Sequence, residues 1–375
     1  MDDSKTTHDL AIVGPLPPPY GGVTVHIKRL LAHLDRAGVD YVVYNTSAET
    51  AASEPAASSE RIQPVGQLGW RWFVRYVLRG PEPVVYVHSS RWDVWAATWW
   101  LARARGKSVI IALHTDSLRR LWPVRGWLAR RMVLGAFRAA GKLIAVNVHI
   151  RDFIDDVAGL GDKTSVIPAF IEPAPGPDDD DAVDSAVRSF CESHHPVILA
   201  NGAPIVYDDG RDLYGIDMTI ELLDSLRTAW PRIGVVWYVL RFAGWSPSYL
   251  EEMTQQIKRR GLEPQWLFVE PTGEMYPVFR NVGLFVRPTC SDGDAVSIRE
   301  ALHFGVPVVA SDAAPRPPGT IVFSTRNQDN FVAKVQTTLE SLDDERAKLA
   351  NLPSSSAVAE EVDLLRRAIQ EARGR

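Results

Sequence analysis

Residues 283–312, GLFVRPTCSDGDAVSIREALHFGVPVVASD, decide how this chain folds. The apolar run at 283–286 predicts a buried strand, which Pro288 ends. A helix is expected over 295–304, and Gly305 with the Val-Pro pair after it ends that helix before another apolar run begins. Strand, polar loop, helix and strand in this order are typical of a βαβ unit in a parallel sheet.

Polar side chains gather in the loop and in the first turns of that helix. Asp292 and Glu300 stand eight positions apart, with Ser297 between them. The carboxyl end of a parallel strand, beside a helix N-terminus, borders the crevice in which open α/β sheets bind ligands. The free N–H groups of the helix favour an anion such as a diphosphate, and a carboxylate accepts hydrogen bonds from sugar or ribose hydroxyls. We therefore expect a ligand site at this edge of the sheet.

The same alternation of strands and helices runs through the whole chain. Strand-like runs such as DLAIVG, YVVYN and SVIIALH, and later PVILAN, GVVWYVL and WLFVE, are separated by helix-like stretches. This pattern predicts an α/β protein with doubly wound, Rossmann-like parallel sheets. The 375 residues suit two domains of roughly 170–190 residues each. We expect a first domain at 1–172, a Pro- and Asp-rich linker at 173–190, a second domain at 191–355 and a C-terminal helix at 356–375.

Composition argues against several classes of protein. The chain is 46% hydrophobic and 23% charged, which is typical of globular proteins. No apolar run approaches the roughly 18 residues of a membrane span, and the polar N-terminus lacks the apolar core of a signal peptide. Cys191 and Cys290 are the only cysteines, with neither metal-ligand spacing nor a disulfide framework. We therefore expect a cytoplasmic protein without zinc.

Charge is distributed unevenly along the chain. The net charge is −5, but residues 61–142 carry +12 and the remainder carries −17. Arg and Trp interleave within 61–142 on helix-like stretches, a composition typical of interfacial helices on anionic lipid. In the alternative interpretation the Trp residues are core and the arginines form a solvated face. Nucleic acid is not expected as a partner, because no DNA- or RNA-binding motif accompanies the basic residues.

The segment at 283–312 resembles the acidic–x7–acidic motif of the retaining GT-B glycosyltransferases of family 4. The motif is Asp292…Glu300 here, followed by the run ALHFGVPV at 301–308, and it departs from the family pattern by having Asp for Glu at the first position. The resemblance implies two Rossmann-like domains that face each other across a cleft, with the last helix returning to the first domain. It also implies that Glu300 holds the nucleotide ribose and that Asp292 lies near the donor sugar.

Two segments of the first half match the family in context. The loop GPLPPPYGGV at 14–23 follows the first strand; it is not a dinucleotide fingerprint, but its resemblance places Gly21 and Gly22 beside the donor phosphates and the acceptor. An ordinary turn is the alternative. His114 ends the strand SVIIALH, where the family places a histidine beside the reacting sugar, and His88 at the end of VVYVH is a weaker candidate.

The cations that the family uses against the diphosphate are missing from their usual places. Asn201-Gly202 stands where the family usually has Gly-Arg, and Tyr214-Gly215 where it has Lys-Gly. A leaving diphosphate still needs positive charge. The available substitutes, each also readable as a surface or ion-pair arginine, are Arg211, Arg241 and Arg287. Further donor-binding candidates are Asp294, Ala295, Ser297 and, after Gly319, Thr320.

Asp292-Gly293-Asp294 also reads as D-x-D, the metal–nucleotide motif of the other glycosyltransferase fold. Mg²⁺ or Mn²⁺ prefers such oxygen ligands. The motif is short and lies inside the longer match, so we expect neither a metal ion nor another cofactor.

Together these features predict a retaining glycosyltransferase. It would move a sugar from a UDP- or GDP-sugar to a hydroxyl of a glycan or lipid-linked acceptor, in synthesis of cell-surface polysaccharide, as a peripheral protein at the inner face of the membrane. Two alternatives stay open, a non-catalytic sugar-nucleotide-binding relative and a nucleotide-sugar epimerase. A nicotinamide dehydrogenase is disfavoured by the failed dinucleotide fingerprint.

Overall fold

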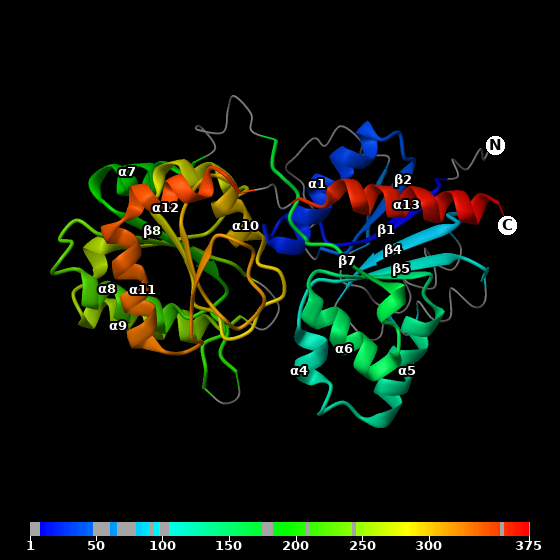
Figure 1. Cartoon of the computed structure of the whole chain (residues 1–375), viewed down its shortest axis with the longest axis horizontal. Coiled ribbons are helices and arrows are strands. Elements are labelled where there is room, and N and C mark those ends of the chain that lie inside the picture. Colours follow the sequence, from blue (N-terminus) through cyan, green and yellow to red (C-terminus); the bar gives the residue numbers. More distant parts are fainter. Residues whose placement is uncertain are drawn as a thin grey trace. The chain divides into compact units, whose positions relative to one another are not determined.

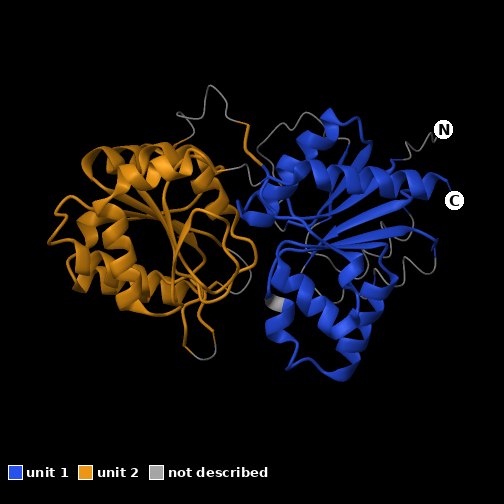
Figure 2. Ribbon diagram, in the orientation of Figure 1, with its two compact units in different colours: residues 1–171, 356–375 blue, residues 172–355 orange. Residues whose placement is uncertain are grey.

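The computed structural model describes residues 8–47, 61–65, 80–89, 94–95, 97, 105–174, 183–207, 210–241, 245–352 and 356–374. The chain divides into two compact units (Figure 2). The first comprises residues 1–171 together with 356–375, and the second comprises 172–355. Each unit has its own parallel sheet, so the predicted class of two doubly wound α/β domains is confirmed.

The first unit alternates strands and helices from its N-terminus. Its strands are β1 (Leu10–Gly14), β2 (Tyr41–Asn45), β3 (Ile62–Pro64), β4 (Val84–His88), β5 (Ser108–Leu113), β6 (Lys142–Ala145) and β7 (Thr164–Val166). The helices with bounds in the described part of this unit are α1 (Gly22–Arg36), α4 (Ser117–Leu121), α5 (Trp127–Ala139), α6 (Val148–Ala158) and, from the C-terminus, α13 (Val358–Arg373). All seven strands are parallel, in the order β3-β2-β1-β4-β5-β6-β7.

Helices cover both faces of this sheet (Figure 1). Helices α1 and α13 pack on one face, where Leu365 and Ile369 join the core that Ile12, Leu30 and the other buried strand residues form. Helices α4, α5 and α6 lie on the other face, where Phe137 of α5 is fully buried. The last helix of the chain therefore completes the first unit, which explains why its apolar stripe is buried.

The second unit repeats the plan with six strands. They are β8 (Val197–Gly202), β9 (Gly234–Val239), β10 (Trp266–Val269), β11 (Leu284–Arg287), β12 (Val308–Ser311) and β13 (Thr320–Phe323), all parallel in the order β10-β9-β8-β11-β12-β13. The helices are α7 (Ser185–Ser193), α8 (Ile216–Leu226), α9 (Pro247–Arg259), α10 (Val296–His303), α11 (Gln328–Glu340) and α12 (Leu342–Leu349). The four inner strands, β8, β9, β11 and β12, are buried along nearly their whole length, as expected for a sheet covered by helices on both sides, whereas the edge strands β10 and β13 are partly exposed.

Three expectations about local structure need comment. The expected linker at 173–190 is too long, because Val183 and Val187 are buried in the core of the second unit and α7 already begins at Ser185. Of the basic, Trp-containing stretches within 61–142, the last forms two helices, α4 and α5, since the chain turns at 122–126 around Pro123 and Gly126. The earlier ones fall largely outside the described residues. No helix in the described ranges combines the length and apolarity needed to cross a bilayer.

Candidate functional site

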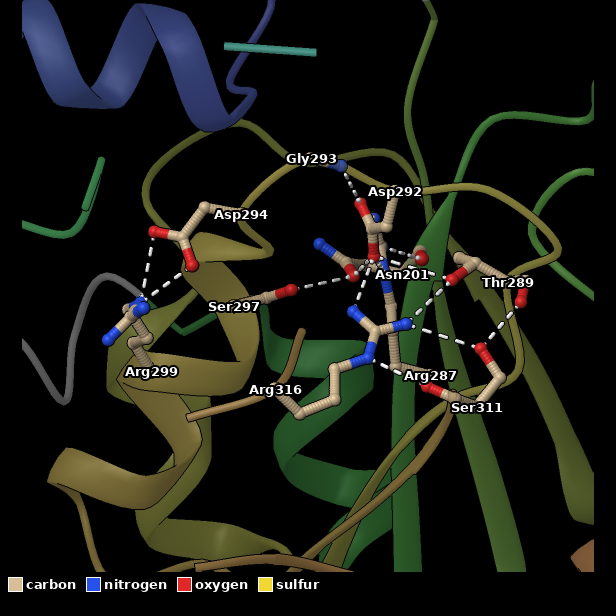
Figure 3. Close-up of polar contacts among 10 residues, drawn as sticks. All are labelled: Asn201, Arg287, Thr289, Asp292, Gly293, Asp294, Ser297, Arg299, Ser311 and Arg316. Carbon is tan, nitrogen blue, oxygen red and sulfur yellow. Dashed lines mark hydrogen bonds and ion pairs between the residues drawn. The ribbon is translucent and has the colours of Figure 1, made fainter. Parts of the chain in front are cut away.

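The carboxyl ends of β8, β11 and β12 form the polar edge of the second unit. The strand order reverses between β8 and β11, which is the topological switch point where doubly wound sheets bind ligands. Asn201 stands one residue before the end of β8, Arg287 ends β11 and Ser311 ends β12. The three strands are adjacent and parallel, so these side chains meet (Figure 3).

Arg287 is at the centre of this edge. Its Nη1 donates to both the backbone oxygen and Oδ1 of Asn201 at 2.9 Å, and its Nε donates to Oδ2 of Asp292 at 3.1 Å. The guanidinium also lies over the ring of Tyr214, 4.9 Å from its centroid. The side chain is therefore held in a single direction by the ends of two neighbouring strands and by the loop that follows β11.

Asp292 lies between two arginines. Its carboxylate accepts from Arg287 and also from Nη1 of Arg316 at 3.0 Å, Oγ1 of Thr289 at 3.3 Å and the N–H of Gly293 at 3.2 Å. Burial alone would raise the pKa of Asp292, but the two guanidinium groups hold that pKa well below its usual range. Because two guanidinium groups face one carboxylate, the cluster has a net positive charge.

Arg316 is the member of this cluster that sequence reasoning missed. Besides Asp292 it bonds Ser311, through Nε to the backbone oxygen at 2.8 Å, and Oγ1 of Thr289 at 3.2 Å. The signal for it was present, since Arg316 lies in the loop that follows β12 at the ligand edge. The sequence pattern of that loop draws attention to Gly319 and Thr320 instead.

Thr320 is at the wrong edge of the sheet for the predicted role. It begins β13 and pairs with Val308, the first residue of β12, whereas Ser311 at the end of β12 borders the polar cluster. At about 3.3 Å per residue, the start and end of this strand are roughly 10 Å apart. The loop 312–319 thus leaves the ligand edge and descends to the opposite one before Thr320.

Ser297 joins α10 to the polar cluster. Its Oγ donates to Oδ1 of Asn201 at 3.2 Å, and no side chain caps the N-terminus of α10 at Ala295. Glu300 follows Ser297 by three positions, so both lie on the same side of the helix, and Glu300 is 5% exposed. The uncapped first turn next to a net positive cluster favours an anion.

The N-terminus of α8, in contrast, is already occupied. Asp212 is buried and accepts from the N–H groups of Tyr214, Ile216 and Asp217, at 2.9, 2.6 and 3.3 Å. Burial and the charge of Asp217 raise the pKa of Asp212. Sequence reasoning overlooked this aspartate, although an acid three residues before a glycine at a helix start is a capping signal.

Two glycines allow this close packing of strand ends and helix. Gly215 has φ +77, and a Cβ there would lie 2.5 Å from the backbone oxygen of Pro288. A Cβ at Gly202 would lie 2.5 Å from Tyr214. Both positions therefore require glycine, one for its conformation and both for space. Gly202 serves the site through packing, while its neighbour Asn201 supplies the polar atoms.

The remaining sequence candidates in this unit are not part of the cluster. Asp294 receives two hydrogen bonds from Nε of Arg299, at 2.7 and 3.0 Å, and Figure 3 shows Asp294 and Asp292 directed toward different arginines. Arg241 is an exposed side chain that pairs with Glu270 and lies over the ring of Trp245. Arg211 is exposed in the turn before α8. Ala295 is buried at the N-cap of α10.

In the first unit, three histidines meet at the corresponding switch point beside β1 and β4. His26 of α1, His88 at the end of β4 and His114 after β5 have ring centroids 5.0 to 5.5 Å apart. Nδ1 of His88 and Nε2 of His114 share a hydrogen bond of 2.9 Å, while Nε2 of His88 is buried with no partner among the described residues. Burial and the neighbouring rings lower the pKa of both His88 and His114 well below the usual value, so both rings are neutral near pH 7.

The pKa of His26, in contrast, is raised. Its Nδ1 donates to the carbonyl of Ala169 at 2.8 Å and its Nε2 contacts Oε1 of Glu361 on α13 at 3.1 Å. Burial would lower its pKa, but Glu361 and the carbonyl raise it above the usual value. Tyr86 donates to the same carboxylate at 2.7 Å. A buried ion pair thus connects the C-terminal helix to α1.

The loop at 14–23, which contains Gly21 and Gly22, is stabilised by hydrogen bonds between its own residues and Thr24. The N–H of Gly21 donates to Oγ1 of Thr24 at 2.9 Å, and Thr24 donates to the carbonyl of Pro19 at 2.7 Å. Gly22 begins α1. The N–H of Gly21 is therefore engaged within the loop, and Gly22 is left as the first residue of the helix N-terminus.

In the described part of the chain, His26, His88 and His114 are the one group of three side chains whose ligand atoms lie close enough to hold a metal ion, within 4.8 Å of one another. However, both ring nitrogens of His26 already have partners, Ala169 and Glu361. A metal ion would have to displace the buried carboxylate from His26, so we assign none to this cluster.

Two family models match the chain over most of its length. The model described as Glycosyltransferase Family 4 matches residues 20–174, and the model described as Glycosyl transferases group 1 matches residues 213–341. No curated protein matches the chain in sequence. The two doubly wound units thus correspond to the two domains of a glycosyltransferase, and the acidic motif lies inside the second match.

Solved structures agree with this fold. Sucrose-phosphate synthase from Thermosynechococcus elongatus has a TM-score of 0.74 at 14% identity, covering 97% of this chain and 100% of that one. HepE from Anabaena in complex with UDP and glucose gives 0.68 at 13% identity, over 98% and 99%. A UDP-forming α,α-trehalose-phosphate synthase from Burkholderia xenovorans gives 0.69 at 14% identity, over 98% and 100%. This chain is a GT-B glycosyltransferase with a family 4 domain followed by a group 1 domain.

Proposed function

We propose that the enzyme transfers a sugar, with retained anomeric configuration, from a UDP- or GDP-sugar to a hydroxyl of a glycan or lipid-linked acceptor. A role in cell-surface polysaccharide synthesis, in the cytoplasm at the inner face of the membrane, fits this chemistry. Structures of the HepE protein were solved with UDP and with UDP-glucose, and the trehalose-phosphate synthase is UDP-forming, which supports a UDP-sugar as the first donor to test.

The observation that carries the proposal is the net positive cluster beside the uncapped helix α10. Arg287 and Arg316 share a single carboxylate, so one unit of positive charge remains at the switch point of the second unit. We infer that the donor diphosphate binds there, at the first turn of α10. Glu300, one turn further, would accept from the ribose hydroxyls.

Asp292 has a different role in this proposal from the one its motif position implied. Its carboxylate already receives five hydrogen bonds, from two arginines, a threonine and a backbone N–H. A carboxylate offers about four lone-pair sites, so a sugar hydroxyl would have to displace one of these donors. We infer that Asp292 is a positioning residue that aims Arg287 and Arg316, rather than a direct contact of the sugar.

The first unit would supply the acceptor side. Because Nε2 of His114 is bonded to His88, Nδ1 is the ring nitrogen that would contact a sugar hydroxyl, as donor or acceptor according to the tautomer. In retention by this class, the donor phosphate takes the proton of the incoming hydroxyl on the same face of the sugar. The protein then contributes orientation and electrostatic stabilisation and needs no nucleophile of its own. We propose that this chemistry proceeds without a metal ion.

A thermal-shift panel of nucleotide sugars tests the proposal. We expect one UDP- or GDP-sugar to raise the melting temperature in the presence of EDTA, and the variant Glu300→Ala to lose that shift. Glu340→Ala, which removes an exposed carboxylate from α11 of the same unit, is the matched control and should keep it. A shift that disappears with EDTA would contradict the metal-free proposal.

Product analysis then separates the alternatives. Transfer to an acceptor with the anomeric configuration of the donor supports the retaining enzyme. An isomerised donor formed without acceptor would identify an epimerase instead. Binding without turnover over a panel of glycan and lipid-linked acceptors would identify a non-catalytic relative.

A further inference from the structure

Figure 1 shows the turn at which α4 ends and α5 begins in the first unit, and exposed apolar side chains gather at this turn. Six large apolar side chains of the described residues are exposed, and four of them lie within eight positions of each other. We call residues 121–128 the 121–128 patch. Its exposed apolar members are Leu121 at 36%, Val124 at 80%, Trp127 at 76% and Leu128 at 56%. Isolated exposed apolar residues are ordinary, but a contiguous group of this kind marks an interaction surface.

The patch is held in shape by contacts beneath it. Trp122 packs edge-on against Phe153 of α6, with ring centroids 5.7 Å apart. Arg130 lies over the ring of Trp122 and donates from Nη2 to the carbonyl of Pro123 at 2.8 Å. The turn between the helices is therefore anchored, and its outward side chains are presented on a supported surface.

The charged residues within and directly beside the patch in sequence are all basic. Residues 117–131 contain five arginines and no acidic residue. Arg119 is paired with Asp116, and Arg120 near the end of α4 and Arg131 in the second turn of α5 are exposed. On neighbouring α6, two of the three acids are engaged locally, Asp152 with Arg151 and Asp155 with the N–H of Gly161.

We propose that the 121–128 patch, with its flanking arginines, docks on an anionic lipid bilayer. Trp and branched apolar side chains enter the boundary between headgroups and acyl chains, and the arginines contact the lipid phosphates. Charge complementarity favours a bilayer over a protein as the partner of the patch. A protein partner would need an apolar pocket surrounded by acidic residues. An anionic bilayer offers apolar acyl chains and negative headgroups over its whole surface. The inference extends the proposed function, since a lipid-linked acceptor is reached at a membrane.

Vesicle sedimentation with the full chain tests this inference. Binding is measured to vesicles of phosphatidylcholine alone and of phosphatidylcholine mixed with phosphatidylglycerol. We expect binding to the anionic vesicles that weakens as salt is added. Val124→Asp should weaken it by about tenfold, because it removes an inserted side chain and adds a repelled charge.

Matched controls come from the chain itself. Val322→Asp makes the same chemical change at another exposed valine, on β13 of the second unit, and should leave vesicle binding unchanged. Arg131→Glu and Arg138→Glu compare two exposed arginines on α5, one beside the patch and one at the far end of the helix. Only Arg131→Glu should weaken binding substantially.

Three results would overturn the inference. They are no binding to anionic vesicles, equal binding by wild type and Val124→Asp, and self-association in solution that Trp127→Ser abolishes, which would make a second copy the occupant. The donor-induced thermal shift is measured without lipid. It therefore still tests the proposed function when docking fails.

Discussion

In both units the strand order reverses beside the first strand, between β1 and β4 in one sheet and between β8 and β11 in the other. The side chains at these two edges differ in kind. The edge of the second unit carries fixed charge, with Asp292 between two guanidinium groups. The edge of the first unit carries His88 and His114, which burial keeps neutral, above the ion pair of His26 and Glu361.

The two sheets share a strand order that reverses beside the first strand, but the side chains at the two edges suit different ligand groups. A diphosphate is charged at every working pH, and a permanent positive cluster stabilises it. A sugar hydroxyl is neutral, and the ring nitrogen that a neutral imidazole has left can form a hydrogen bond with it without bringing a charge to the site. The histidine edge of the first unit should therefore be sensitive to pH. The charged edge of the second unit should be sensitive to the removal of any one of its charged side chains.

The largest effect is expected from removing the carboxylate of the charged cluster. Asp292→Ala leaves two nearly buried guanidinium groups facing each other, and breaking a buried ion pair in this way costs about 3–5 kcal/mol. Urea denaturation measures the loss. Asp312→Ala, which removes an exposed carboxylate from the loop after β12, should cost less than about 1 kcal/mol. Equal losses in the two variants would show that the cluster contributes no special stability.

The next effect concerns catalysis at the histidine edge. His114→Ala should lower kcat/KM by roughly 10- to 100-fold, since a hydrogen bond to the reacting sugar or acceptor is lost. His88→Ala should lower it less, by about tenfold or under, because in the proposed arrangement His88 would affect the sugar only through its hydrogen bond to His114. Steady-state kinetics with the identified donor compares the two. A larger defect in His88→Ala would reverse the roles.

A smaller effect is expected from pH. The pKa values of His88 and His114 are lowered by folding, so the unfolded chain binds more protons as pH falls through about 6.5. Each such histidine therefore costs the folded state about 1.4 kcal/mol per pH unit below that point, until its folded pKa is reached. His26, with a raised pKa, acts in the opposite direction and stabilises the fold as pH falls.

The comparison of wild type with His88→Asn isolates this pH effect. Urea midpoints measured between pH 7.5 and pH 5.5 should fall more steeply for wild type than for the variant. Parallel pH profiles would contradict the inference that the folded protein keeps His88 neutral.

The sequence predicted the fold well because periodicity is a local property. The strand at 284–287 and the helix at 296–303 were both anticipated, and with them the polar loop that contains Asp292. Pairing across the sheet is not local, and this is why Arg316 was missed and why Thr320 was expected at the ligand edge although it begins β13 at the opposite edge. Only the register of β12 with β13 shows which end of the loop lies at the ligand edge.

Side-chain partners were the other limit of sequence reasoning. Asp294 and Arg241 are charged residues that follow strands of the second unit, as ligand-binding residues would. In the structure, however, Asp294 pairs with Arg299 and Arg241 pairs with Glu270. The ion pair of His26 with Glu361 joins residues 335 positions apart, and no spacing rule predicts such a contact. The exposure of the 121–128 patch likewise depended on how α4 and α5 pack, since a tryptophan in a basic helix is equally compatible with the core.

The most direct test of the account is the affinity for the nucleoside diphosphate alone. Isothermal titration of UDP and GDP should give at least tenfold weaker binding to Arg316→Gln than to wild type, because the cluster loses its excess positive charge. Arg326→Gln, which removes an arginine paired with Asp217 at α8, should bind as wild type does. An unchanged dissociation constant in Arg316→Gln would contradict a donor site at the carboxyl ends of β8, β11 and β12.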